Sequence, residues 1–281
     1  MKKIGFVDYY ISEWHADNYP AWIKDASKKM NEDFEVAYAW AERDVSLVDG
    51  VTTDEWCEKN NVKKCETIAE LCEKSDYIVV LAPSDPDKHL KYAQEVLKYQ
   101  KNTYIDKTFA PDYETAKKIF DLSAKYGTQF FSTSALRYAD ELKKINNAVK
   151  VDVRGGGSNI EEYIIHQIEM MVCVLKKSAQ RVKVEKVGEN QFTCYIDFGN
   201  NEVSTLYFAQ GTPFSISATD GNGVANNYNI ESDFFLNLII SILEFFLSGN
   251  IPFNADETLQ VMKVREAVVK AVGKIGEWIT L

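Results

Sequence analysis

In the first half of the chain, short apolar runs alternate with stretches of helical periodicity. Tyr77 to Ala82 is apolar throughout, which is typical of a strand covered on both faces. We predict strands at Lys2–Val7, Phe34–Trp40, Tyr77–Ala82, Thr103–Asp106 and Gln129–Ser132, and helices at Pro20–Met30, from Thr53, at Thr67–Lys74, at Pro86–Tyr99 and at Pro111–Tyr126, the last ended by Gly127. Such strand–helix–strand units predict a parallel sheet with helices on both faces and ligands at the carboxyl ends of its strands.

The second half of the chain instead predicts antiparallel strands. In Phe192–Phe198 the even positions are apolar, and glycine- and asparagine-rich links join this run to its neighbours. The elements expected here are a helix around Asp140–Asn147, strands at Arg181–Val187, Phe192–Phe198, Glu202–Phe208 and near Pro213–Thr219, the links Gly188–Asn190 and Gly199–Asn201, and a final helix from about Asp256. The fold class is therefore α/β plus α+β. A Rossmann-type parallel sheet is expected over residues 1–138 and a largely antiparallel sheet over residues 139–281.

Composition excludes several classes of protein. The 281 residues are 46% hydrophobic and 26% charged, which is a globular balance and argues against disorder. The net charge of −10 disfavours nucleic acid as a partner. The most apolar run, Phe234 to Leu247, is too short to cross a bilayer, so we expect a mostly buried helix and no membrane partner. The five cysteines lack zinc-like spacing and the first residues lack a signal-peptide pattern, which predicts no metal site and a cytoplasmic location.

Several short motifs occur in an order that belongs to one family. They are Ile78–Ser84 with His89 on the following helix, Asp106-Lys107-Thr108 after a strand, Leu136-Arg137-Tyr138 after the last Rossmann strand, Glu162-x-x-x-His166-x-x-Glu169, and the closing helix from Asp256 to Gly276. Together they resemble the Gfo/Idh/MocA family of NAD(P)-dependent sugar and cyclitol oxidoreductases. The likeness spans nearly the whole chain.

The resemblance implies NAD or NADP as cofactor, a small polyol or sugar-like substrate, and a homodimer or larger assembly. It assigns catalysis to Lys107, His166 and Glu162, and substrate contacts to Glu169 and Arg137. The positions that it places near the cofactor are Tyr9, Tyr10, Ile11, Trp40, Ala82, Pro83, His89 and Asp106.

The residue types at these positions suit acid–base chemistry. Glu162 and His166 are four residues apart, which places them on one helical face, where a carboxylate can orient an imidazole. Lys107 follows a parallel strand, where an ammonium can polarise a substrate hydroxyl. Each has a structural alternative: His166 as a core histidine, Lys107 as a solvated lysine, and Arg137 as the partner of an acid.

The cofactor loop departs from the family pattern. The three glycine positions hold Asp8, Tyr10 and Glu13, and Trp40 stands where an acidic ribose anchor is expected. Two carboxylates disfavour a pyrophosphate by charge, and side chains obstruct its approach to the backbone. The same loop supplies Trp14 and His15, which would form part of a new pocket wall. Two functions stay open: an NAD(P)-dependent oxidoreductase, and a cofactor-free ligand-binding or regulatory descendant. A cofactor-independent lyase or isomerase is a third.

Overall fold

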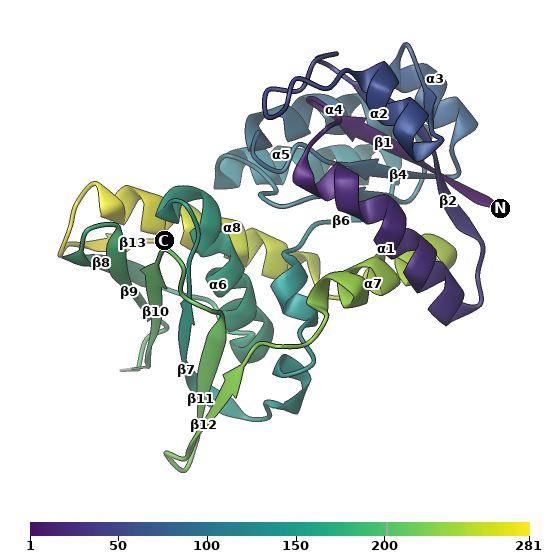
Figure 1. The fold of residues 1–281 in the computed structure, drawn as a ribbon. Helices are drawn as coiled ribbons and strands as arrows, with labels where there is room; N and C mark the ends of the chain where they lie inside the picture. The colour runs from purple at the N-terminus through teal and green to yellow at the C-terminus, as the bar shows by residue number, and fades with distance from the viewer. Residues whose placement is uncertain (201) are drawn as a thin grey trace. The chain divides into compact units, whose positions relative to one another are not determined.

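The computed structural model describes residues 1–200 and 202–281, which form two compact units (Figure 1). Unit 1 comprises Met1–Thr133 and Phe235–Phe253, and unit 2 comprises Ser134–Phe234 and Asn254–Leu281. The chain therefore returns to unit 1 once before it ends in unit 2, a return that the predicted division at residue 138 does not contain. The predicted fold class, α/β plus α+β, is confirmed.

Unit 1 is built on a six-stranded parallel sheet with the order β3-β2-β1-β4-β5-β6. Its strands are β1 (Lys2–Asp8), β2 (Phe34–Ala41), β3 (Lys63–Lys64), β4 (Tyr77–Val80), β5 (Thr103–Ile105) and β6 (Phe130–Phe131). The strand order reverses direction between β1 and β4, and in doubly wound sheets ligands bind beyond the carboxyl ends at that point. Gly5 lets β1 approach α3 closely, because a Cβ there would lie 2.4 Å from the Ser75 hydroxyl.

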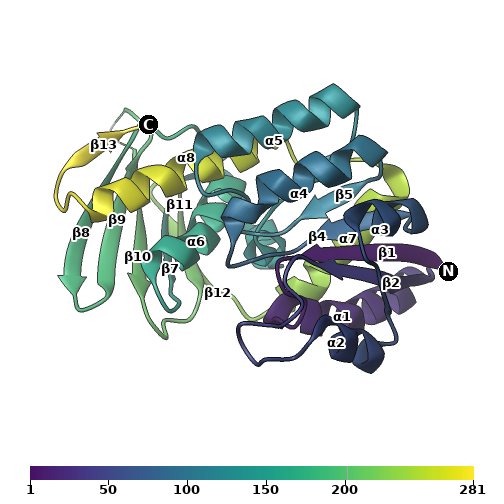
Figure 2. The same cartoon turned by 90° about the horizontal axis from the view of Figure 1, so that it is seen from above.

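Helices cover both faces of this sheet (Figure 2). They are α1 (Trp14–Met30), α2 (Thr53–Asn60), α3 (Ile68–Lys74), α4 (His89–Val96), α5 (Tyr113–Tyr126) and α7 (Phe234–Ser248), with short 3-10 turns at Pro86–Lys88 and Leu97–Tyr99. On one face α3, α4 and α5 pack in succession. On the other, α1 contacts α2 through a hydrogen bond from the Trp56 indole to Asp17, and α7 through the stacked rings of Trp22 and Phe235.

Two expectations for these helices had different outcomes. Gly127 ends α5 in the left-handed conformation, as predicted. The predicted start of the first helix at Pro20 is wrong, because α1 begins at Trp14 and Pro20 lies inside it. The reason is a cap at Glu13, described below, which allows the helix to start directly after the loop.

The buried helix predicted from the apolar run at Phe234 is α7. Its side chains Leu238, Ile242 and Phe245 are buried, whereas Glu244 is exposed. The Asn102 amide donates to the carbonyl oxygen of Phe246 at 3.1 Å, which ties the end of α7 to the sheet of unit 1. No helix in the described part of the chain is long and apolar enough to cross a membrane.

Unit 2 contains a seven-stranded mixed sheet with the order β12-β11-β7-β10-β9-β8-β13. Its strands are β7 (Ala148–Gly155), β8 (Arg181–Gly188), β9 (Gln191–Asp197), β10 (Val203–Ala209), β11 (Ser215–Asp220), β12 (Ala225–Asn229) and β13 (Trp278–Thr280). Only β7 and β10 pair in parallel among these described strands. The helices α6 (Ile160–Leu175) and α8 (Ala255–Val272) pack on each other and along one face of the sheet (Figure 2).

The helix predicted around Asp140–Asn147 is wrong. This stretch holds a short 3-10 turn, Leu142–Lys144, and leads directly into β7. Val149, Val151 and Val153 alternate with charged residues, which is the period-two pattern of a half-buried strand. The predicted link Gly199–Asn201 includes residue 201, which lies outside the described residues.

Candidate functional site

The first turn of α1 is capped by a carboxylate. Glu13 is the N-cap residue, and its side chain accepts hydrogen bonds from the backbone nitrogens of His15 at 2.9 Å and Ala16 at 2.5 Å. Glu13 is buried, and this burial raises its pKa although the His15 charge opposes the shift. Backbone N–H groups at a helix N-terminus attract anions, and here a carboxylate of the same chain holds them.

A second carboxyl group, that of Asp8, also binds backbone N–H groups in this region. Asp8 ends β1, and its Oδ1 accepts hydrogen bonds from the backbone nitrogens of Tyr9 at 2.7 Å and Ala82 at 3.0 Å. Its Oδ2 is buried and has no hydrogen-bond partner among the described residues. Burial first, and then the nearby Glu13 charge, raise the Asp8 pKa well above its ordinary range. The surroundings of Asp8 therefore favour its protonated form.

The other loop positions expected to line a cofactor are packed on the protein itself. Ile11, Ala82 and Pro83 are buried. Tyr9 and Tyr10 are half-buried, with ring centroids 5.6 Å apart, and the Lys88 ammonium lies 4.3 Å from the Tyr9 ring. The aromatic cluster thus contacts side chains of unit 1.

The end of β2, where the ribose anchor is expected, is also engaged. The Trp40 ring is half-buried at 5.8 Å from the Tyr92 ring. Glu42, two residues on, accepts hydrogen bonds from Lys91 and from the Tyr92 hydroxyl, each at 2.9 Å. Hydrogen bonding to Lys91 is the main reason that the Glu42 pKa is lowered, so this carboxylate is ionised and already paired.

His89 is tied to the backbone at both ring nitrogens. Nδ1 lies 2.9 Å from the carbonyl oxygen of Phe109, and Nε2 lies 2.5 Å from that of Leu81. The residue is fully buried, and burial lowers its pKa although both carbonyls oppose the shift. Its contacts connect α4 to the segments that follow β4 and β5.

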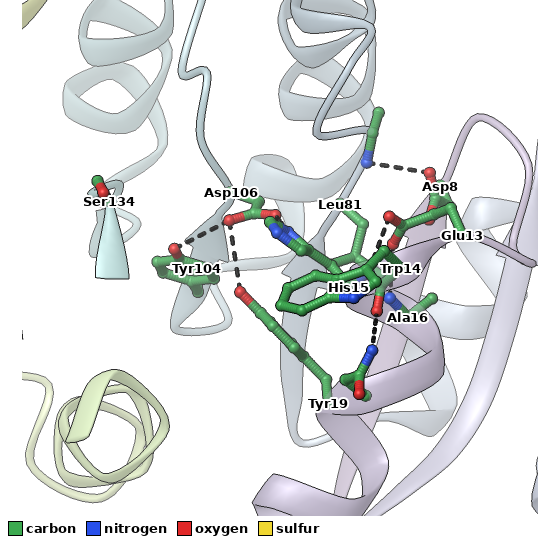
Figure 3. A network of polar contacts seen from close by, with 12 residues as sticks. Asp8, Glu13, Trp14, His15, Ala16, Tyr19, Leu81, Tyr104, Asp106 and Ser134 are labelled. Atoms are coloured by element: carbon green, nitrogen blue, oxygen red, sulfur yellow. Dashed lines mark hydrogen bonds and ion pairs between the residues drawn. The ribbon is translucent and has the colours of Figure 1, made fainter. Parts of the chain in front are cut away.

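The remaining histidine of unit 1 forms the core of a polar network (Figure 3). His15 Nδ1 pairs with Oδ2 of Asp106, the residue directly after β5. The other oxygen of Asp106 accepts from the hydroxyl groups of Tyr104 at 3.2 Å and Tyr19 at 3.4 Å. Burial alone would raise the Asp106 pKa, but the charge and hydrogen bond of His15, with the nearby Lys107 ammonium, lower it. The carboxylate is therefore ionised.

Lys107 follows Asp106, as the sequence requires, and its side chain is half-buried in unit 1. His166 belongs to unit 2, where its Nδ1 lies 2.7 Å from the Ser134 hydroxyl. Lys107 and His166 belong to different units, so the expectation that they face each other stays a prediction.

The acidic residues of α6 have different environments. The Glu162 side chain lies 3.2 Å from the amide of Asn159, the cap residue of the helix. Glu169 is buried and pairs with the Nε of Arg137, whose Nη1 donates to Glu257 at 2.6 Å. Burial opposes the charge on Arg137, but its two carboxylate partners raise its pKa. Pairing with an acid was the structural alternative for this arginine, and the roles of these residues toward a substrate stay predictions.

Sequence reasoning missed two partners in these networks. Ser134 and Glu257 were not singled out, although Ser134 directly follows the last strand region of unit 1 and Glu257 opens the final helix. The only available signal was their position at element ends. No group of three or more His, Cys, Asp or Glu side chains suited to a metal ion occurs in residues 1–200 and 202–281.

Comparison with known proteins gives consistent results. Residues 28–134 match the model of the oxidoreductase family with the NAD-binding Rossmann fold, Gfo/Idh/MocA. No curated protein matches the sequence.

Solved structures match over the whole chain. A probable dehydrogenase from Thermotoga maritima has a TM-score of 0.79 at 12% identity, covering 99% of this chain and 98% of its own. A scyllo-inositol dehydrogenase from Lactobacillus casei, solved with NAD(H) and scyllo-inositol, has a TM-score of 0.77 at 14% identity, with coverage of 99% and 98%. A putative myo-inositol dehydrogenase from Sinorhizobium meliloti 1021 has a TM-score of 0.75 at 11% identity, with coverage of 100% and 99%.

At such identities the solved structures establish the fold, and the family model adds a match in sequence. Together, the match over residues 28–134 and the two-unit fold confirm the predicted resemblance of this chain to the Gfo/Idh/MocA oxidoreductase family.

Proposed function

We propose that this chain is a descendant of the Gfo/Idh/MocA fold that binds a small polyol or sugar-like molecule without NAD(P) in the standard dinucleotide position. The observation that carries the proposal is Glu13, whose carboxylate accepts from the backbone nitrogens of His15 and Ala16. In Rossmann domains the N–H groups at this helix end and the glycine loop receive the pyrophosphate.

The residues present do not fit a dinucleotide. A pyrophosphate at this helix end would compete with the Glu13 carboxylate for the same donors, and their like charges would repel. Asp8 occupies the donors of Tyr9 and Ala82 in the same way. At the end of β2, Glu42 is paired with Lys91 and Tyr92, so a ribose hydroxyl would displace existing bonds.

A polyol or sugar-like ligand agrees with the charge of this loop. The Glu13 carboxylate disfavours a phosphate group by its charge, whereas a hydroxyl group can donate a hydrogen bond to a carboxylate. The aromatic rings of Tyr9, Tyr10 and Trp14 offer faces on which a sugar ring can pack. Relatives by fold are titled inositol dehydrogenases, which supports the same ligand class.

The test is the identity of the molecules carried by the natively purified protein. Mass spectrometry after denaturation is expected to find an uncharged polyol or sugar-like compound and no nicotinamide nucleotide. NAD(H) or NADP(H) released in an amount close to one per chain would overturn the proposal. A Glu13→Gln variant, which keeps an acceptor oxygen at the cap, serves as the matched control for a charge effect.

A second candidate is an NAD(P)-dependent oxidoreductase acting on a hydroxyl of a sugar, sugar acid or cyclitol. It is favoured by the family match over residues 28–134 and by the presence of Lys107, Glu162 and His166, to which the sequence resemblance assigns catalysis. Reduction of NAD or NADP in the presence of myo-inositol or scyllo-inositol, followed by the absorbance of the reduced nicotinamide, tests it. Turnover lost in Lys107→Ala would support this candidate, and full turnover in that variant would remove the role of the lysine.

The proposal includes a homodimer or larger assembly. Within unit 2, α6 and α8 cover one face of the sheet, while Lys183, Tyr195 and Thr205 of the other face are half-buried. A second copy would cover that face. Sedimentation at micromolar concentration is expected to give at least twice the chain mass, and a monomer mass would contradict this part.

A further inference from the structure

His15 and Asp106 form a buried imidazole–carboxylate pair at the ligand-binding end of the parallel sheet. Their side chains are 8% and 1% exposed. Asp106 directly follows β5, and His15 lies in the first turn of α1, which the loop after β1 leads into. The carboxyl ends of these strands are where ligands of doubly wound sheets bind.

The carboxylate fixes which nitrogen of His15 is available. Both oxygens of Asp106 are engaged, one by His15 and the other by the hydroxyls of Tyr19 and Tyr104 (Figure 3). An ionised carboxylate only accepts hydrogen bonds, so Nδ1 of the neutral imidazole must carry the proton. Nε2 then carries the lone pair, and it has no hydrogen-bond partner among residues 1–200 and 202–281.

The ring is held in place by its neighbours. Tyr19 stacks on it with a centroid distance of 5.5 Å and an interplanar angle of 11°, and the Trp14 ring lies 5.1 Å away. Trp14 is 53% exposed, so this end of α1 reaches the surface. The contrast with His89 is direct, since both nitrogens of that ring face backbone carbonyls and none is left for a ligand.

We propose that Asp106 and His15 form a proton-transfer centre, in which His15 Nε2 removes a proton from a carbon next to the carbonyl of an uncharged keto-polyol or ketose. Asp106 is the positioning residue. The inference rests on the proposed function, because a protein without a hydride acceptor cannot oxidise a hydroxyl. Reversible proton transfer at carbon needs neither oxidant nor reductant.

The step balances within the ligand and His15. The C–H bond breaks, its proton joins Nε2, and its electron pair forms a C=C bond while the carbonyl π pair moves to oxygen as an enolate. The imidazolium can return the proton to the same carbon, which gives exchange or epimerisation. It can instead protonate the former carbonyl carbon, once a proton has passed from the neighbouring hydroxyl to the enolate oxygen, which gives isomerisation. Asp106 stabilises the imidazolium between the two transfers.

The surrounding charges select against phosphorylated ligands. Glu13 lies two residues before His15 and opposes an anion by its carboxylate, and Asp106 adds a buried negative charge. The positive charge next to the pair is the ammonium of Lys107, which directly follows Asp106 in the sequence and acts electrostatically on it. We therefore expect an uncharged ketone to react and a ketose phosphate to be rejected.

The test is hydrogen–deuterium exchange by the full chain in D₂O, followed by proton NMR. The probes are 2-keto-myo-inositol, D-fructose and dihydroxyacetone, with D-fructose 6-phosphate as the charged comparison. We expect exchange next to the carbonyl of at least one uncharged probe, falling roughly 100-fold to 10,000-fold in His15→Gln, the range for a general base. Asn18→Ala is the matched control, because Asn18 lies on the same helix as His15 and its amide donates to the carbonyl oxygen of Trp14, outside the pair, so this variant should keep most of the rate.

Nitrogen-15 NMR of the histidine rings gives a readout that does not depend on a variant folding. The chain has three histidines, so the His15 signals can be assigned with His89→Gln and His166→Gln. We expect a protonated Nδ1 and an unprotonated Nε2 in the wild type, and loss of that tautomer preference in Asp106→Asn. An exchange rate equal in wild type and His15→Gln, no exchange with any uncharged probe, or a protonated Nε2 with a bare Nδ1 would each overturn the inference. If the purified protein carries a polyol but catalyses no exchange, this inference fails and the proposed function stands. If the purified protein carries NAD(P), the proposed function fails.

Discussion

Replacing Asp106 with asparagine removes the charge of a buried group while keeping its volume. The carboxylate pairs with His15 and accepts from Tyr19 at 3.4 Å and Tyr104 at 3.2 Å. Asparagine leaves the donors from His15, Tyr19 and Tyr104 without their charged acceptor, which costs about 3 kcal/mol, the upper end for an unsatisfied buried group. With about 2–4 °C of melting temperature per kcal/mol for a unit of this size, we expect Asp106→Asn to lower the melting temperature by about 6–12 °C.

The sign of the pH dependence follows from the lowered Asp106 pKa. Its stabilising contribution is fully present above the unfolded value of about 3.9 and is lost as the pH falls through the lower folded value. The difference in melting temperature between wild type and Asp106→Asn should therefore be constant from pH 8 to pH 5 and become smaller below about pH 4. Differential scanning calorimetry across this range, with Tyr104→Phe as the control expected to cost about 1 kcal/mol, is the assay. A melting temperature of Asp106→Asn equal to that of Tyr104→Phe at pH 7 would refute the reasoning.

Three further predictions concern stability. Because the pKa of Asp8 is raised in the folded state, the wild type loses stability as the pH rises from about 4 toward that folded value. Asp8→Asn should therefore be more stable than wild type at pH 8, by about 1.4 kcal/mol for each unit of the shift, and equally stable near pH 4; a gain in stability that is independent of pH would contradict this. Glu169→Gln should cost about 3–5 kcal/mol in urea unfolding because it leaves Arg137 short of a buried partner, and the double variant Arg137→Met with Glu169→Met should recover most of it; a double variant as unstable as the single one would count against the pair. Asn102→Ala should weaken the attachment of α7 by about 1 kcal/mol, seen as faster amide exchange in Phe234–Ser248, and unchanged exchange there would show that the aromatic contacts suffice.

The parallel sheet of unit 1 could be predicted because each strand is a local apolar run. Tyr77–Val80 is covered on both faces, and its sequence shows this without any reference to its neighbours. The strand at Ala148–Gly155 is not predicted, although its valines alternate with charged residues, because the polar residues before it favour a helix. The start of α1 depended on a capping carboxylate in a loop whose family pattern calls for glycine.

The candidate site was predictable only in part, because its contacts are not local. The residues Lys107 and His166 follow from family positions, but the pairing of His15 with Asp106 joins positions 91 residues apart in the chain. It depends on the order β1-β4-β5, which a single sequence does not specify. The hydrogen bonds from the backbone of α1 to the Glu13 carboxylate likewise depend on the geometry of a helix end, which the sequence does not show.

Isothermal titration of NAD and NADP into the wild-type chain tests the central claim most directly, since it asks whether the helix end held by Glu13 still accepts a dinucleotide. With the cofactor at millimolar concentration, the account predicts no heat beyond that of dilution. Saturable binding of either nucleotide to one site per chain at micromolar affinity would contradict it.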